Sequence, residues 1–112
     1  MYTQLMFAVN KNLALVPGTS NTSVSVNTIN SGTVSGSNSE GICDAIDPNW
    51  KSYSSYFVSN FPNLPSSNQM TFDGYTIPLV ARAAVKCGAT YHMKIAVADV
   101  GDQNYDSGVF LL

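Results

Sequence analysis

Charge is scarce in this 112-residue chain. Charged side chains make up 11% of the residues, with five basic and seven acidic side chains, whereas globular proteins usually carry about 25%. A net charge of −2 offers no basic field for a phosphate backbone. The sequence also lacks an apolar run near the roughly 20 residues that a membrane-spanning helix needs. We therefore expect no nucleic-acid partner and no membrane span in this segment.

Residues suited to catalysis are equally sparse. His92 is the single histidine, and it lies in the middle of an expected strand, where a histidine usually faces solvent or bonds to a neighbour. The sequence has no G-x-S-x-G elbow, no pair of carboxylates at catalytic spacing and no glycine loop of the kind that cradles phosphate. We therefore predict that the chain is not an enzyme.

Cysteine is limited to Cys43 and Cys87. A zinc site needs two close pairs of ligands or accompanying histidines, so this isolated pair is not a zinc motif. Two interpretations stay open: a pair of buried free thiols, or a disulfide that closes a long loop and stabilises the fold by up to about 4 kcal/mol. The surface composition, rich in Ser, Thr, Asn and Gly, is common in secreted β proteins. In an exported protein we favour the disulfide.

Short strands separated by turn signals dominate the rest of the sequence. Turn-forming pairs stand at residues 10–11, 17–18 and 73–74, and a four-residue turn is expected at 87–90. Apolar or alternating runs between them predict strands at 4–9, 12–16, 23–27, 77–86, 91–99 and 107–112, and a further short run at 70–72 leads into the turn at 73–74. About seven short strands with turns every dozen residues predict an all-β fold, an antiparallel β-sandwich of jelly-roll type. We expect one domain over residues 1–112, and an excerpt of a longer exported protein.

The alternating strands also predict the core. One face of each strand is apolar, and that face should be buried. The residues expected to be buried on this basis are Leu13, Leu15, Val24, Val26, Ile95, Val97, Val109 and Leu111.

The middle of the chain interrupts the strand pattern. Residues 28–41 are mostly Ser, Gly, Asn and Thr, which predicts a surface loop. Asp47-Pro48 is a fair helix start, and the aromatic side chains that follow recur near helical spacing, so we expect one short helical turn there. Aromatic residues of this kind more often close the end of a sandwich than stack on a sugar. The ligand-binding alternative is carried by Trp50, Tyr53 and Tyr56.

Aspartates cluster between the last two expected strands. Asp99, Asp102 and Asp106 lie in one loop, with Asn104 between them. Ca²⁺ prefers several carboxylate and carbonyl oxygens at close range, although the spacing is not that of an EF-hand. Aspartate also caps turns by accepting backbone N–H bonds. The loop is thus either a calcium site, with Asp73 as a further ligand, or a set of capped turns.

Five blocks of sequence resemble the choice-of-anchor L domain. They occur in the same order as in that family and span most of the chain. The blocks are Asn12–Thr19 (NLALVPGT), Val24–Asn27 (VSVN), Phe72–Thr76 (FDGYT), Cys87–Asp99 (CGATYHMKIAVAD) and Gly101-Asp102 with Tyr105–Leu111 (YDSGVFL). The last block is the most specific. The Ser/Gly-rich segment 30–41 and the segment around Trp50 match no part of the pattern.

The resemblance implies a module of large exported bacterial proteins, located outside the cell or at its surface. Such modules stand beside varied surface anchors or sorting domains, and the family brings no established catalytic residues. We expect a non-catalytic binding or adhesion module with an unknown surface ligand, either glycan or protein. The alternative is a structural subunit that self-associates by strand pairing into a fibre or surface layer.

Overall fold

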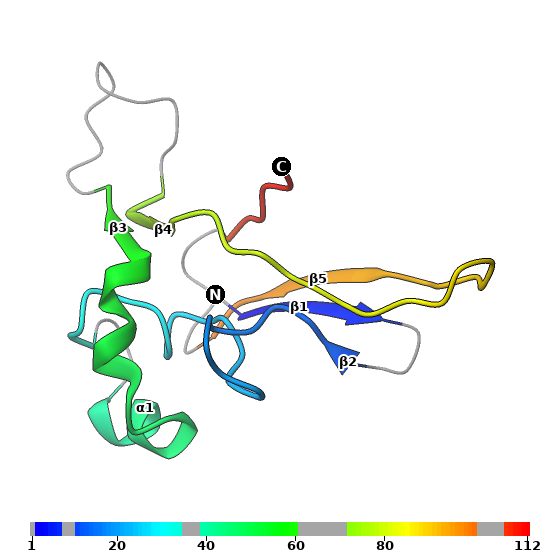
Figure 1. Cartoon of the computed structure of the whole chain (residues 1–112). Helices are drawn as coiled ribbons and strands as arrows, with labels where there is room; N and C mark the ends of the chain where they lie inside the picture. The colour runs from blue at the N-terminus through cyan, green and yellow to red at the C-terminus, as the bar shows by residue number, and fades with distance from the viewer. Residues whose placement is uncertain (1, 8–10, 35–38, 61–71, 101–106) are drawn as a thin grey trace.

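The computed structural model describes residues 2–7, 11–34, 39–60, 72–100 and 107–112 (Figure 1). Within them lie two small antiparallel sheets and two helical segments. The elements are β1 (Tyr2–Phe7), β2 (Lys11–Asn12), α-helix α1 (Glu40–Ile46), 3-10 helix η1 (Trp50–Tyr56), β3 (Phe57–Ser59), β4 (Gly74–Thr76) and β5 (Lys94–Ala98). No helix in these residues has the length and hydropathy needed to cross a membrane.

The larger sheet joins the first strand among the described residues to the last. Its order is β2–β1–β5, and both pairings are antiparallel. Met6 lies opposite Asn12 in the first pair, and Leu5 lies opposite Ile95 in the second. The first pair confirms that the start of the chain folds back antiparallel, but Lys11, expected in the turn, lies in β2 opposite Phe7, and the strand expected over 12–16 ends at Asn12.

The smaller sheet pairs β3 with β4 and corrects one turn prediction. Asp73-Gly74 was expected to form a hairpin turn, but Gly74 lies in β4 opposite Ser59. A Cβ atom on Gly74 would collide with the ring of Phe57, so glycine is required here for close packing between the strands. The neighbouring Asp73 carbonyl accepts the backbone N–H of Asn60 at 2.8 Å.

A long extended segment, residues 77–93, leads from β4 to β5 and is called the hairpin arm below. It projects away from the helices and turns back at Cys87-Gly88 (Figure 1). The turn is where the sequence predicts it: Gly88 has φ +79°, and the Ala89 N–H bonds to the Lys86 carbonyl at 3.3 Å. Residues 77–86 were expected to be a strand, but no strand pairing is assigned to them, and Pro78 has no N–H to contribute.

Two helical segments replace the one that the sequence predicts. The predicted short helical turn after Pro48 is η1. The additional helix, α1, begins at Glu40, inside the stretch expected to be surface loop. It ends at Ile46 because Pro48 disfavours helical geometry at Asp47, whose backbone N–H still bonds to the Cys43 carbonyl. The start of α1 was not predicted because the residues before it are rich in Ser and Gly, which is typical of a loop.

The apolar core is small and lies between the loop after β2 and the helical segments. Its buried centre comprises Val16, Val24 and Ile29, packed against the partly buried Tyr53, Tyr56, Phe57 and Leu79. Trp50 is also fully buried, with 0% of its surface exposed. These side chains come from segments far apart in sequence, so they hold η1 and β3 against the loop.

The predicted core is confirmed only in its N-terminal part. Leu13 and Val24 are buried, whereas Leu15, Val26 and Val109 are partly buried. Ile95, Val97 and Leu111 are exposed, at 41%, 39% and 65%, so their burial was predicted wrongly. Their alternation is that of a strand, but no second layer covers β5 among the described residues. The final segment 107–112 was expected to be a strand and has no strand assigned. The jelly-roll sandwich stays a prediction.

Replacing Trp50 with alanine should lower the free energy of unfolding by about 3–5 kcal/mol, because it empties a fully buried site. Replacing Val85 with alanine, at a side chain that is 59% exposed on the hairpin arm, should change it by less than about 0.5 kcal/mol. Urea unfolding monitored by circular dichroism measures both. Equal losses in the two variants would contradict this core.

Candidate binding site

Polar residues are buried in the segment 21–30, which follows the turn at Pro17-Gly18. Thr22, Ser25, Asn27, Thr28 and Asn30 are each less than 9% exposed. Most of their polar groups are paired, as buried groups must be. The Thr28 hydroxyl donates to the Ser23 carbonyl at 2.7 Å and accepts the Ser25 backbone N–H at 3.0 Å. The segment is therefore a loop held by its own side chains.

This loop corrects two predictions. Residues 23–27 were expected to form an alternating strand, but only isolated bridges occur there, such as that between Leu15 and Ser23. Thr28 and Asn30 were expected at the start of a surface loop, and both are buried. Ser and Thr side chains compete for backbone groups, which turns the chain instead of extending it.

The Asp47 carboxylate fixes the loop against the helical segments. Its Oδ2 accepts the hydroxyls of Thr22 and Tyr53, each at 2.8 Å, and its Oδ1 accepts the backbone N–H of Asn49 at 2.9 Å. These bonds, led by the one from Asn49, lower the pKa of Asp47. The same contact raises the pKa of Tyr53, whose hydroxyl donates to the carboxylate. Three segments meet at this one side chain.

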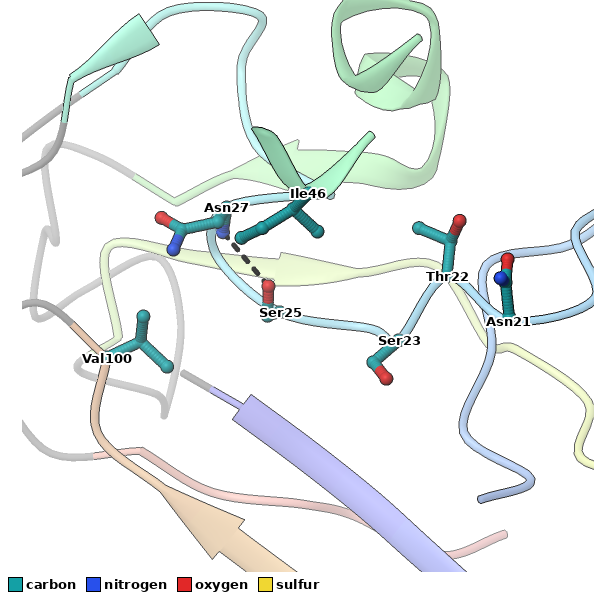
Figure 2. A pocket seen from close by; sticks show the side chains of 7 residues that line it. All are labelled: Asn21, Thr22, Ser23, Ser25, Asn27, Ile46 and Val100. Atoms are coloured by element: carbon teal, nitrogen blue, oxygen red, sulfur yellow. Dashed lines mark hydrogen bonds between the residues drawn. The ribbon is translucent and has the colours of Figure 1, made fainter. Parts of the chain in front are cut away.

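A pocket of about 260 Å³ opens beside this network. Five of its lining residues come from the loop, and Ile46 and Val100 complete it from the end of α1 and the chain after β5 (Figure 2). The loop residues that line it are Asn21, Thr22, Ser23, Ser25 and Asn27. All five have neutral polar side chains, so the pocket offers hydrogen bonds without a formal charge.

Asn27 stands out within the lining. It is 4% exposed, and its Oδ1 is buried without a hydrogen-bond partner among the described residues. Its backbone N–H donates to Ser25 Oγ at 3.2 Å, and its side-chain amide points away from that serine (Figure 2). Asn30, a buried asparagine three residues later, has both groups paired: Nδ2 with the Val26 carbonyl at 2.7 Å and Oδ1 with the Gly32 N–H at 2.9 Å.

The predicted aromatic ligand site is not exposed as a stacking surface. Trp50 is fully buried, and its indole N–H donates to Asp44 Oδ1 at 2.8 Å. The Tyr53 hydroxyl is bonded to Asp47, and Tyr56 packs on the core. Trp50 therefore has no exposed ring face on which a sugar could stack. The packing role that the sequence also allowed is the one observed.

The predicted calcium site lies largely outside the described residues, which do not include Asp102 and Asp106. Asp99 is exposed, and its Oδ1 accepts the Ser107 hydroxyl at 3.3 Å, a bond between two side chains. Asp73 lies next to β4, on a different sheet from β5. No group of three metal-ligating side chains occurs in the part of the chain that is described. Calcium binding by the loop stays a prediction.

The predicted disulfide between Cys43 and Cys87 is not formed. Both thiols are free: Cys43 is buried in α1, and Cys87 is exposed at the tip of the hairpin arm. The prediction was based on amino-acid composition and on the expected export of the protein. Neither gives information about the distance between the two cysteines in the fold. Burial, reinforced by Asp44 and Glu40, raises the pKa of the Cys43 thiol.

Sequence reasoning missed the pocket because its residues look like ordinary surface positions. Asn, Ser and Thr favour exposed turns, and nothing in the spacing of these residues indicates that they are buried. One signal was present: an aspartate two residues before an asparagine, beside proline, is typical of a side chain that bonds the backbone just after it. The Asp47–Asn49 contact is such a bond.

The Asp47 network predicts an acid-dependent stability. Because the pKa of Asp47 is lower in the folded state, its contribution is present above the unfolded value of about 3.9 and is lost as pH falls through the folded value. Tyr53→Phe removes one donor, so it should lower the melting temperature at pH 7 by a few degrees, and this deficit should shrink between pH 4 and pH 2.

Tyr56→Phe is the matched control, since Tyr56 packs on the same core, and the tyrosine bonded to Asp47 is Tyr53. It should change the melting temperature less than Tyr53→Phe does at pH 7. Thermal melts of both variants over this pH range make the comparison. A Tyr53→Phe deficit that is equal at pH 7 and pH 2 would argue against the charged bond.

Comparison with known proteins agrees with the resemblance seen in the sequence. The choice-of-anchor L domain matches residues 4–112, which is nearly the whole chain. No curated protein and no solved structure matches it. The family is not a catalytic one, and its domains are modules of exported, surface-exposed bacterial proteins. On this match, the chain belongs to the choice-of-anchor L domain family.

Proposed function

We propose that this chain is a non-catalytic binding module that holds its ligand in the pocket beside Asp47. The observation that supports the proposal is the pocket's construction: five neutral polar side chains from one loop, braced by a buried carboxylate. A surface-exposed module with such a pocket is suited to attaching its parent protein to a polymer or partner outside the cell. Adhesion through a bound ligand is then its role.

The chemistry of the lining supports binding in preference to catalysis. General acid–base catalysis needs a titratable side chain within hydrogen-bond reach of the reacting group. None of the seven lining residues titrates. Asp47 stands behind Thr22 with both carboxylate oxygens bonded, and it serves as a brace. His92 is exposed on the hairpin arm and does not line the pocket.

The binding proposal is tested by cosedimentation of the full chain with insoluble cellulose, chitin, peptidoglycan and fibrillar collagen. We expect retention on at least one of these polymers, with no release of reducing sugars or peptides. Asn21→Trp places a large side chain at the exposed rim of the pocket and should weaken retention at least about tenfold, equivalent to 1.4 kcal/mol.

Ser20→Trp is the matched control, because Ser20 is the exposed neighbour of Asn21 and does not line the pocket. It should keep retention within about twofold of the parent chain, a small fraction of 1 kcal/mol. Retention on none of the four polymers, equal weakening by the two variants, or release of soluble products would contradict the proposal.

A second candidate function, assembly by strand pairing, is favoured by the exposed apolar side chains around β5. Val80, Val85 and Met93 on the hairpin arm are 71%, 59% and 60% exposed, and Ile95 and Val97 follow in β5. β5 is an edge of the larger sheet as described. Apolar side chains beside an open strand edge promote pairing with another chain.

Light scattering after size exclusion tests assembly. If strand pairing drives it, the parent chain should elute as multimers whose size rises with concentration, and Val80→Lys with Val85→Lys should return it to monomers. The control is Ile42→Lys, at a side chain that is 45% exposed on α1, away from the hairpin arm. A monomer at every concentration would exclude this second function.

A further inference from the structure

The polar side chains of the pocket offer both hydrogen-bond donors and acceptors. The Thr22 hydroxyl donates its hydrogen to Asp47, so its oxygen can only accept a hydrogen bond from a ligand. Ser25 Oγ already accepts the Asn27 backbone N–H, and Asn27 Oδ1 has no donor among the described residues. A ligand that completes this site must therefore bring donors for Thr22 and Asn27 Oδ1 and acceptors for the side-chain amides and the Ser23 hydroxyl, and sugar hydroxyl groups serve as both.

The charges around the pocket further restrict the class of ligand that it can bind. No lining side chain is charged, but the Asp47 carboxylate stands behind the wall and is bonded directly to Thr22. The lowered pKa of Asp47 keeps that carboxylate ionised at neutral pH. A carboxylate or phosphate ligand would meet a like charge across a partly desolvated wall. Anionic ligands are thus disfavoured, whereas neutral ones carry no such penalty.

Shape and size complete the description. Ile46 and Val100 add two branched aliphatic side chains to the polar arc formed by the loop (Figure 2). At about 260 Å³, the cavity lies just below the range of roughly 300–1,000 Å³ in which drug-sized ligands bind. A pyranose ring combines these properties, since it has hydroxyl donors at its rim, apolar C–H faces and no charge.

We propose that the pocket binds one neutral pyranose unit, and that a sugar hydroxyl donates to Asn27 Oδ1 after the amide swings toward the cavity. The sugar packs its C–H groups on Ile46 and Val100. This inference rests on the proposed binding function and names the ligand class for the same pocket. It differs from aromatic stacking, because the site uses hydroxyl and amide groups of the loop instead of Trp50.

Asn27 and Asn30 provide a matched pair for the test. Both are buried asparagines of one loop, but only Asn27 lines the pocket and has an unpaired oxygen. Leaving a buried acceptor unpaired costs stability, so replacing it with an apolar side chain of similar size removes that cost. Asn27→Leu should keep or raise the melting temperature, whereas Asn30→Leu should lower it by several degrees because two bonds are lost.

The experiment is a titration of the ¹⁵N-labelled full chain with glucose, galactose, N-acetylglucosamine, glucosamine and glucuronate. We expect at least one neutral sugar to shift the Asn27 side-chain amide and the backbone amides of Thr22 and Ser25. The dissociation constant should be about 1–10 mM, in line with the ligand efficiency of a dozen heavy atoms. Glucuronate should give no shifts at the same concentration.

Asn27→Leu should raise the dissociation constant for the sugar at least fivefold. Asn30→Leu should leave the dissociation constant of the folded protein unchanged. Asn21→Trp, at the exposed rim, provides a second variant that does not alter a buried position. Absence of shifts with every neutral sugar at 50 mM, equal binding of glucuronate, or a preference for glucosamine would overturn the neutral-pyranose assignment. Retention on collagen that Asn21→Trp abolishes, without sugar shifts, would preserve the binding function while excluding this ligand class.

Discussion

The carboxylate of Asp47 is the constraint on which the described structure depends. It is nearly buried, and a buried charge is tolerated only when its oxygens are bonded. Three donors meet this requirement, and they come from the polar loop, the turn after α1 and η1. Because Thr22 is held in this way, the loop keeps its place beside Ile46, and the pocket between them has a fixed wall.

Around that anchor, the loop divides its polar groups between structure and recognition. The Thr28 hydroxyl and the Asn30 amide are fully used in holding the chain's own turns. Asn27 directly precedes Thr28 in sequence and has an unpaired oxygen instead. A loop whose neighbouring groups are satisfied can keep one unsatisfied group in position, and sites of binding are where such a cost is usually tolerated.

Local patterns in the sequence predicted local structure well. The first hairpin, the turn at Cys87-Gly88 and the helical turn after Pro48 were all foreseeable, because each depends on a few adjacent residues. The burial of Ile95 and Val97 was not, since alternation shows that a strand has two faces but not which face another layer covers. The pocket was equally invisible, because Thr22 and Asp47 are 25 residues apart and their contact is purely tertiary. Family membership, in contrast, depends on blocks of similar sequence that occur in a fixed order, so it could be inferred from the sequence alone.

The two thiols differ in a way that is useful at the bench. Cys87 is exposed at the tip of the hairpin arm, and Cys43 is enclosed in α1 with its reactive thiolate form disfavoured by burial. A maleimide dye should therefore attach to one position without any cysteine being removed. Since Cys87 is not among the residues that line the pocket, that dye can report on attachment to a surface while the pocket stays unmodified.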